Sequence, residues 1–388
     1  MLVIRSGPIY YEQPRRSTRP IWKSIKTKFN RIRRHDVGHE REIVLDQLLH
    51  AVPGLASLIT LDVCLAYSLD DHSFYWTKLN VIKAGWPIFA ANLTTLTIDV
   101  PLEEIHLVLL PHITLLRLEK LSIILHIAHQ TSEPNDLLRN SLSPFLIAHS
   151  PTLRSLKLDA LEKVDMSSVL ADLRHMPCLN TLHISHRFLS LESTSLVGHH
   201  QFLETHRSQL KYLTFDYFEW GFPSFNTPEE FFNQEWCRVP FPELRSLSFR
   251  LRVSYSTMSF EDGAITYIQQ HIPIVESLQV LLPFSYDQVA SILTGPKGGE
   301  YQLTKLGILD LEIWCFSPAL LSLFAVNTPQ LQSLRLRPTV LGPDKQPEPF
   351  GGNRVLEVSP LPFSGLYQHI EINYFATVLQ SLAIQLHP

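Results

Sequence analysis

Cysteine is scarce in this chain, and its spacing excludes several classes of protein. Four cysteines in 388 residues lie far apart, and no two of them form the C-x-x-C pair typical of zinc sites or a dense disulfide framework. Two long-range disulfides stay compatible with this spacing, but the pattern favours a reducing compartment. The cysteines are Cys64, Cys178, Cys237 and Cys315.

Long apolar runs are missing as well. A membrane-spanning helix needs about 18 or more consecutive apolar residues. The most apolar stretch, 109–127, contains Arg117, Glu119 and Lys120. We therefore expect a soluble, intracellular protein of the cytoplasm or nucleus.

The sequence also lacks the motifs of common enzyme classes. It has no G-x-S-x-G nucleophile turn, no G-x-x-x-x-G-K-[ST] phosphate loop and no G-x-G-x-x-G dinucleotide fingerprint. The glycine-rich stretch 294–301 lacks a Ser or Thr after its lysine, and 39–43 has Ile43 where a second zinc-binding histidine would stand. Carboxylates in 69–74 and 260–263 lie beside turn residues, where we expect loops or helix N-caps. We expect no catalytic activity.

Histidine is abundant, with 18 residues, but its spacing does not favour a metal site. His183 and His186 are three residues apart on a predicted strand, which directs their side chains to opposite faces. No carboxylate stands nearby at ligand spacing, so we expect no metal and no cofactor. Four histidines recur at the ends of predicted helices, where an imidazole can bind the last carbonyls and the negative end of the helix dipole. They are His149, His175, His206 and His271.

The net charge of −4 conceals a strong asymmetry between the start of the chain and the remainder. Residues 1–34 hold ten Lys or Arg and one acidic residue, whereas the remainder holds 23 basic and 36 acidic residues. The pattern predicts a basic N-terminal segment, 1–40, with an amphipathic helix at 21–34. This helix could cap the first repeat, bind an anionic membrane surface or a calmodulin-like partner, or act as a targeting signal. Its basic residues are Lys23, Lys26, Lys28, Arg31, Arg33 and Arg34.

A ten-residue phrase recurs six times in the remaining chain, 41–388. The copy "HSPTLRSLKL" begins at His149, and the others begin at His175, His206, Pro240, His271 and Asn327. Each has an aliphatic residue at positions five and eight and an apolar residue at position ten, and five have proline at position three. Proline ends a helix, and the alternation that follows predicts a half-buried strand beginning near position five.

Successive predicted strands begin about 30 residues apart, and the residues between the phrases include amphipathic helical stretches. Such stretches occur at 41–52, 166–176, 261–272 and 317–327, and looser copies of the phrase occur at 53–63, 92–98, 113–123 and 378–384. A unit of one strand and one helix cannot bury its apolar face alone and must stack on its neighbours. The sequence therefore predicts an α/β solenoid with parallel strands on the concave face and helices on the convex face.

The phrase resembles the irregular leucine-rich repeats of fungal F-box/leucine-rich-repeat proteins, with Pro before the first Leu and Ser at position seven. One departure is that no Asn or Cys stands three residues after the last strand Leu, where the side chains of the regular family form a polar ladder. The resemblance implies a non-catalytic substrate-recognition protein of a cullin–RING ubiquitin ligase. It also implies an F-box that binds a Skp-type adaptor. The closest stretch, 44–64, has Val63 and Cys64 in place but no Leu-Pro opening, and it also reads as a helix followed by a repeat strand.

Two other functions stay open: a scaffold with no ubiquitin-ligase link, and a membrane-surface recruiter that uses the basic helix. Nucleic-acid binding is not expected, because the body is acidic and carries no recognised motif.

For the repeats, we expect a protein partner on the concave face. Alternation places positions seven, nine and eleven on this face. The candidate protein-binding residues are Lys157, Asp159, His183, Thr214, Asp216, Ser248, Arg250, Gln279, Asp310, Glu312, Arg335 and Arg337.

Overall fold

A computed structural model describes most of the repeat region. The described residues are 2–4, 46–47, 49–65, 72–110, 113–126, 134–160, 166–187, 197–218, 232, 234–252, 262–295, 303, 305–315, 317–340 and 370–373. The chain divides into two compact units. Unit 1 comprises Met1–Glu162 and Asp172–Cys178, and unit 2 comprises Lys163–Ala171 and Leu179–Pro388.

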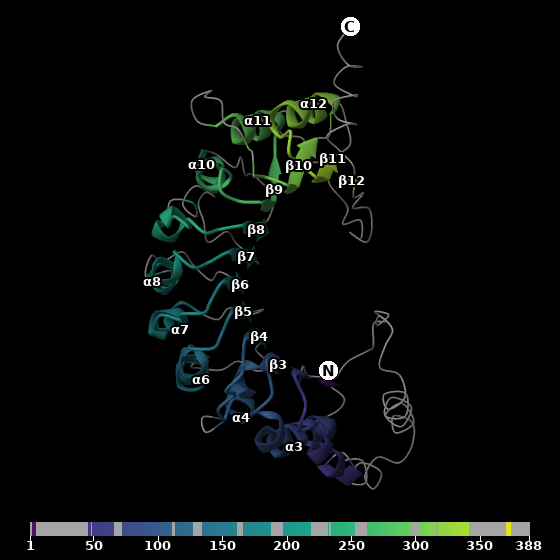
Figure 1. Ribbon diagram of the computed structural model, residues 1–388, viewed down its shortest axis with the longest axis vertical. Helices are drawn as coiled ribbons and strands as arrows, with labels where there is room; N and C mark the ends of the chain where they lie inside the picture. Colours follow the sequence, from purple (N-terminus) through teal and green to yellow (C-terminus); the bar gives the residue numbers. More distant parts are fainter. Residues whose placement is uncertain are drawn as a thin grey trace, which may run out of the picture. The chain divides into compact units, whose positions relative to one another are not determined.

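Unit 1 alternates strands with helices, and its strands pair in parallel in the order of the sequence (Figure 1). The strands are β1 (Leu2–Ile4), β2 (Thr60–Cys64), β3 (Thr95–Pro101), β4 (Lys120–His126) and β5 (Ser155–Ala160). The α-helices are α3 (His72–Phe89), α4 (Ile105–Val108), α5 (Pro134–Leu137) and α6 (Ser143–His149). Unit 1 also contains the short 3-10 turns η1 (Val52–Leu55) and η2 (Leu102–Glu104) and a π-helical turn η3 (Leu138–Leu142), and residues 46–47 and 49–51 are helical, within the stretch 41–52 that was predicted to be a helix.

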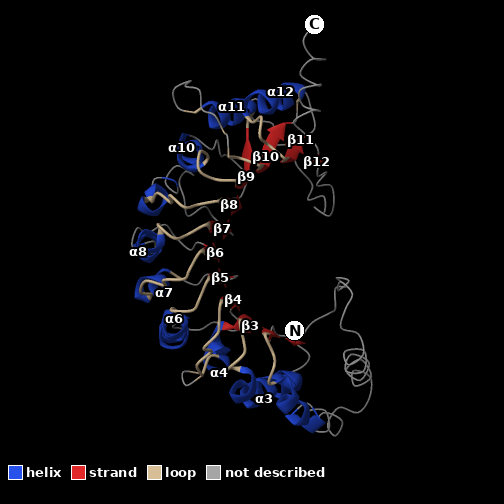
Figure 2. Ribbon diagram, in the orientation of Figure 1, coloured by secondary structure: helices blue, strands red, loops and turns tan. Residues whose placement is uncertain are grey.

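Unit 2 continues the same alternation, with helices on one side of its strands (Figure 2). Its parallel strands are β6 (Thr181–Arg187), β7 (Tyr212–Phe218), β8 (Ser246–Arg252), β9 (Ser277–Phe284), β10 (Ile308–Cys315) and β11 (Ser333–Val340). Its helices are α8 (Val197–His206), η5 (Glu235–Arg238), α10 (Asp262–His271), α11 (Tyr286–Thr294) and α12 (Pro318–Asn327). Helix α7 (Ser167–Asp172) lies at the division between the two units in the sequence.

The last strand departs from the repeat. β12 (Ile370–Asn373) pairs with β11 in the antiparallel direction, with Ser333 opposite Asn373. The predicted copy at 378–384 lies outside the described residues.

The strands begin two residues later than predicted, at position seven of the phrase instead of position five. The residue at position five belongs to a tight turn. The N–H groups of Thr152 and Leu153 both donate to the carbonyl of His149, each at 3.2 Å, and the Leu153 side chain is fully buried. The position-five Leu therefore fills the core below the turn, and the period-two strand starts after it.

A backbone contact links successive repeats at the entries to β3, β4 and β5 and to β7 through β11. The Lys211 carbonyl accepts from the N–H groups of Arg245 at 2.8 Å and Ser246 at 3.0 Å, and the Arg245 carbonyl accepts in the same way from Glu276 and Ser277. Equivalent paired bonds recur in both units. Because the contact uses only main-chain atoms, neighbouring repeats can stack here without the polar side-chain ladder that the sequence lacks.

The stretch 219–239 interrupts the repeat with a Pro- and aromatic-rich sequence that is typical of a loop, but its described part packs into the core. Trp236, in η5, is 1% exposed, and its ring centroid lies 5.0 Å from that of Phe215 and 5.8 Å from that of Tyr217. Phe232 contacts Phe249 in the same cluster, with 5.3 Å between ring centroids. A second Pro- and aromatic-rich stretch, 338–363, lies almost entirely outside the described residues.

Both stretches with carboxylates beside turn residues lead into helices. α3 begins at His72, within 69–74, and α10 begins at Asp262, within 260–263. Asp70, Asp71 and Glu261 themselves lie outside the described residues. In the described part of the chain, no helix combines the length and apolar character needed to cross a bilayer.

Candidate protein-binding surface

The strands of unit 2 have one face toward the helices and one face without them, which we call the open sheet face (Figure 2). Alternation along β8 illustrates the division. Leu247 and Phe249 are buried at about 1% exposure or less, whereas Ser246, Ser248 and Arg250 are partly exposed. Positions eight and ten therefore fill the core, and positions seven, nine and eleven line the open sheet face.

The strand register aligns half of the twelve predicted residues in one row, at position nine. His183 pairs with Thr214, Thr214 with Ser248, Ser248 with Gln279, Gln279 with Asp310, and Asp310 with Arg335. Because neighbouring strands lie about 4.8 Å apart, this row brings residues from six distant parts of the sequence onto one line across the open sheet face.

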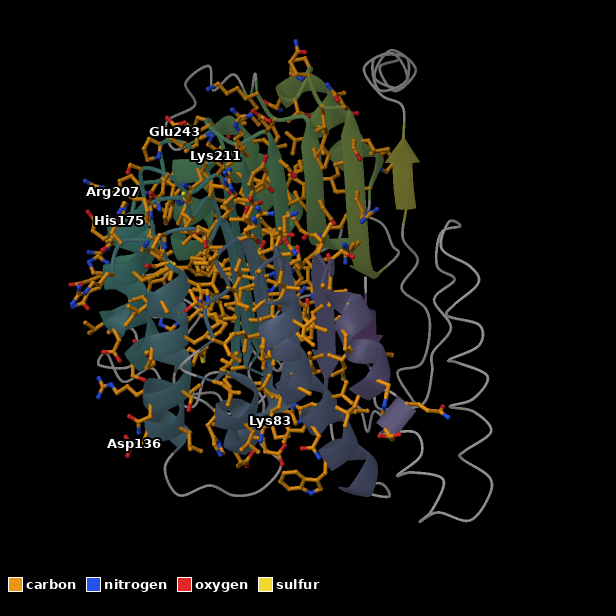
Figure 3. All side chains as sticks on the ribbon, turned by 60° about the horizontal axis from the view of Figure 1, so that its bottom comes forward. Lys83, Asp136, His175, Arg207, Lys211 and Glu243 are labelled. Carbon is orange, nitrogen blue, oxygen red and sulfur yellow. The ribbon has the colours of Figure 1, made fainter. Side chains whose placement is uncertain are left out.

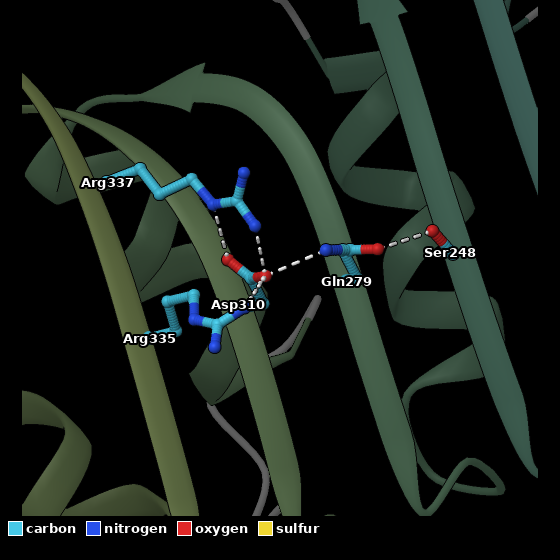
Figure 4. Close-up of polar contacts among 5 residues, drawn as sticks. All are labelled: Ser248, Gln279, Asp310, Arg335 and Arg337. Atoms are coloured by element: carbon cyan, nitrogen blue, oxygen red, sulfur yellow. Dashed lines mark hydrogen bonds and ion pairs between the residues drawn. The ribbon is translucent and has the colours of Figure 1, made fainter. Parts of the chain in front are cut away.

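Four members of this row and Arg337 form a continuous polar chain (Figure 4). The Ser248 hydroxyl donates to Gln279 Oε1 at 2.8 Å, and Gln279 Nε2 donates to Asp310 Oδ2 at 2.7 Å. Arg337 donates to both carboxylate oxygens of Asp310, from Nε at 3.0 Å and from Nη2 at 2.7 Å. Arg335 Nη1 lies 3.7 Å from the same carboxylate. Charge-assisted, two-point bonds of this kind fix a guanidinium in one orientation.

The ion pairs of the open sheet face have their carboxylates deeper than their guanidinium groups. The Asp310 side chain is 8% exposed, whereas Arg337 is 22% and Arg335 is 39% exposed. A second pair joins Asp216 to Arg250 at 3.2 Å, with side-chain exposures of 16% and 29%. The part of these clusters that faces solvent is therefore mainly arginine.

Two exposed apolar side chains of this face were not among the predicted residues. Tyr212 on β7 is 46% exposed and Ile308 on β10 is 49% exposed. Both occupy position seven, where β8, β9 and β11 have serine. The signal was present in the sequence as two large apolar residues at a position that is otherwise mostly Ser or Thr.

In unit 1, the two predicted residues are neighbours on β5. Lys157 and Asp159 form an ion pair at 3.7 Å, and the carboxylate is 15% exposed. Glu312, the remaining predicted residue of unit 2, lies opposite Arg337 in the β10–β11 register.

Sequence reasoning also missed a cluster of three side chains in unit 1. Cys64 Sγ donates to Asp99 Oδ2 at 3.1 Å, and His126 Nδ1 lies 3.4 Å from Asp99 Oδ1. Burial raises the pKa of Asp99, but hydrogen bonds from His126 and Cys64 outweigh it, and the pKa lies below its ordinary value. Among the described residues no three His, Cys, Asp or Glu side chains are arranged to hold a metal ion, and this trio is included in that statement.

The predicted helix-capping role is confirmed for two of the four recurring histidines. His149 is buried, its Nε2 accepts from the Leu115 N–H at 2.9 Å, and its Nδ1 therefore donates to the Phe145 carbonyl at 2.7 Å. His206 makes the same contact with the Phe202 carbonyl at 2.7 Å.

The other two histidines differ from this pattern. His271 is buried among aromatic rings, and desolvation lowers its pKa to about 4. His175 is exposed, because α7 ends three residues before it, at Asp172, instead of continuing to 176 as predicted.

The turns of unit 2 expose charges of both signs. Figure 3 shows Arg207, Lys211 and Glu243 in the turns between helices and strands, where Arg207 pairs with Glu204 at 2.9 Å. These turns therefore have no single dominant charge. The basic segment 21–34, with its six predicted cationic residues, lies outside the described residues.

Comparisons with known proteins find likeness in structure only. No family model matches the sequence, and no curated protein matches it. A leucine-rich-repeat-containing protein, LegL7 from Legionella pneumophila, superposes with a TM-score of 0.38 at 13% identity, covering 66% of this chain and 87% of that protein. Rad7, from a Rad7–Elc1 complex in yeast, gives a TM-score of 0.37 at 13% identity, with coverage of 86% and 97%.

The structure of a TLR13–ssRNA13 complex gives a TM-score of 0.32 at 15% identity and covers 74% of this chain and 40% of that one. The assignment of fold rests on the chain itself, on its repeated phrase, its parallel strands in sequence order and its alternating helices. The chain has a leucine-rich-repeat fold. Its repeats are irregular, with polar contacts of the main chain at the strand entries.

Proposed function

We propose that this chain is a non-catalytic repeat protein that binds a protein partner through the open sheet face of unit 2. The observation that carries the proposal is the polar chain from Ser248 through Gln279 and Asp310 to Arg337. Its side chains are fixed by mutual hydrogen bonds before any partner arrives. Binding to groups already held in place loses less conformational entropy than binding to free side chains.

The size of this surface suits a protein segment. Six parallel strands, spaced about 4.8 Å apart, extend over about 24 Å. Along this width the face alternates hydroxyl, amide and charged groups with the exposed side chains of Tyr212 and Ile308. Apolar contacts surrounded by polar and arginine side chains are typical of protein interfaces.

We further propose that the chain recognises substrates for a ubiquitin ligase. This link is supported by the resemblance of the ten-residue phrase to the repeats of F-box/leucine-rich-repeat proteins. Within the stretch that is most like an F-box, Val63 is buried in β2, a strand paired with β3, which favours the interpretation as a repeat strand. The alternatives are a scaffold without a ligase link and a membrane-surface recruiter that uses 21–34.

One experiment tests the face and the ligase link together. Tagged full-length chain is used to capture proteins from extracts of its own cells, beside Ser246→Lys on the open sheet face and Gln201→Lys on the exposed side of α8. Lysine is tolerated at position seven, since Lys120 occupies it in β4. We expect Ser246→Lys to capture about tenfold less of at least one partner than the parent chain does. Gln201→Lys should capture that partner in the same amount as the parent chain.

Equal capture by both variants would contradict the proposed face. A Skp-type adaptor that is captured by all three proteins supports the ligase link, because an F-box would bind it apart from the open sheet face. Partners that depend on Ser246, without an adaptor in any sample, support the scaffold alternative instead.

A further inference from the structure

We propose that the partner segment is extended, lies across the strands of unit 2, and carries two apolar residues four positions apart followed two positions later by Asp or Glu. This inference rests on the proposed function and names the chemistry of the partner.

The two apolar side chains lie in one row. Tyr212 pairs with Ser246, Ser246 with Ser277, and Ser277 with Ile308. Tyr212 and Ile308 are thus three strand spacings apart, or about 14 Å. The two residues between them are serines, whose small side chains leave room for a chain to pass between the apolar contacts.

An extended segment matches this distance. Each residue of a strand advances about 3.3 to 3.4 Å, so four residues span about 13 to 14 Å, and residues four apart point to the same side. A segment that places one apolar residue against Tyr212 therefore places the fourth residue after it against Ile308, with both side chains directed at the sheet.

The arginines determine the third contact. Arg335 lies on the next strand after Ile308, in the position-nine row, and its side chain is 39% exposed above the nearly buried carboxylate of Asp310. Two residues beyond the second apolar residue, an extended segment has advanced about 7 Å and again points to the sheet. A carboxylate at that position reaches the guanidinium groups of Arg335 and Arg337, each of which has more N–H donors than its contact with Asp310 uses.

Nearby acids limit this attraction to direct contact. Asp310 already lies between the two arginines, and Glu312, opposite Arg337, has an interaction of its own. The positive field of the arginines is therefore local and does not extend over the whole face. The acidic residue adds specificity, and the two apolar residues supply most of the affinity.

The test is selection from a phage-displayed library of random dodecapeptides on the full-length chain. We expect enriched peptides to share the pattern apolar–x–x–x–apolar–x–acidic. Their affinity, measured by fluorescence anisotropy with the labelled peptide, should fall at least tenfold for Tyr212→Ser with Ile308→Ser. The fold should be retained, since serine occupies the same position in β8, β9 and β11. Arg335→Gln should lower the affinity of the same peptides by about threefold to tenfold. It should also remove the preference of the chain for Asp or Glu over Asn or Gln at the last position of the pattern.

Enrichment of peptides without this spacing, equal binding by the double serine variant, or no enrichment at all would each overturn the proposal. A thermal unfolding curve matching that of the parent chain excludes misfolding of the variant. The proposed function is tested separately by the Ser246→Lys capture. If Ser246→Lys loses a partner but the selected peptides lack the expected pattern, the open sheet face is still the binding surface. Only the proposed sequence of the partner segment is then rejected.

Discussion

Replacement of Trp236 by alanine is expected to lower the free energy of unfolding by about 3 to 5 kcal/mol, the range for removing a large aromatic side chain from a core. Trp236 is 1% exposed, and its ring packs against those of Phe215, Tyr217 and Tyr267. The surrounding rings cannot close the space that the indole would leave, because each is held by its own strand or helix.

The control for this prediction is Trp76→Ala. Trp76 in α3 is 53% exposed, so its removal should change the free energy of unfolding by about 1 kcal/mol or less. Urea unfolding followed by far-UV circular dichroism measures both variants. Equal effects of the two substitutions would mean that η5 is not part of the core of unit 2.

The repeat strands could be predicted from the sequence, whereas the packing of the stretch around Trp236 could not. Position-eight residues such as Leu156 and Leu247 recur in a period-two pattern after a helix-ending proline, so their burial in parallel strands was predictable. The insert around Trp236 follows no repeat and contains Pro and Gly, which are typical of loops. Its packing depends on contacts with β7, β8 and α10, and no local pattern encodes such contacts.

Replacement of Asp310 by alanine is expected to lower the free energy of unfolding by about 2 to 3 kcal/mol and to disrupt the open sheet face. Without the carboxylate, Arg337 loses two charge-assisted hydrogen bonds and Gln279 loses one. The guanidinium groups of Arg335 and Arg337 would then lie close together with no negative charge between them. Removing one partner of a buried pair can cost about 3 to 5 kcal/mol, and the partial exposure of the arginines reduces this value.

Asp159→Ala provides the matched control. Asp159 is a position-eleven carboxylate on a strand, and within the described part of the chain its ion pair is with Lys157, at 3.7 Å. Its removal should lower the free energy of unfolding by about 1 kcal/mol or less. Asp310→Asn keeps the shape but not the charge and should fall between the two alanine variants. A result in which Asp310→Ala and Asp159→Ala are equally mild would mean that the polar chain contributes little to the stability of the face.

The candidate surface was only partly predictable. Alternation was enough to select side chains such as Gln279 and Asp310 for one face, because it depends only on local strand geometry. Their connection into one chain depends on the register between strands that are about 30 residues apart in the sequence. The exposure of Tyr212 and Ile308 depends on the same register, and so does the trio of Cys64, Asp99 and His126 in unit 1.

The measurement that tests the central claim most directly is the position of a bound partner on unit 2. A photoreactive benzoylphenylalanine is placed at Ser277, between Tyr212 and Ile308 on the open sheet face, or at Gln201 on α8, and the full-length chain is irradiated in its own cells. The account predicts a crosslinked polypeptide from Ser277 that is reduced by Tyr212→Ser with Ile308→Ser, and none of comparable yield from Gln201. Crosslinks from Gln201 but not from Ser277 would contradict it, because the partner would then bind the helices instead of the strands.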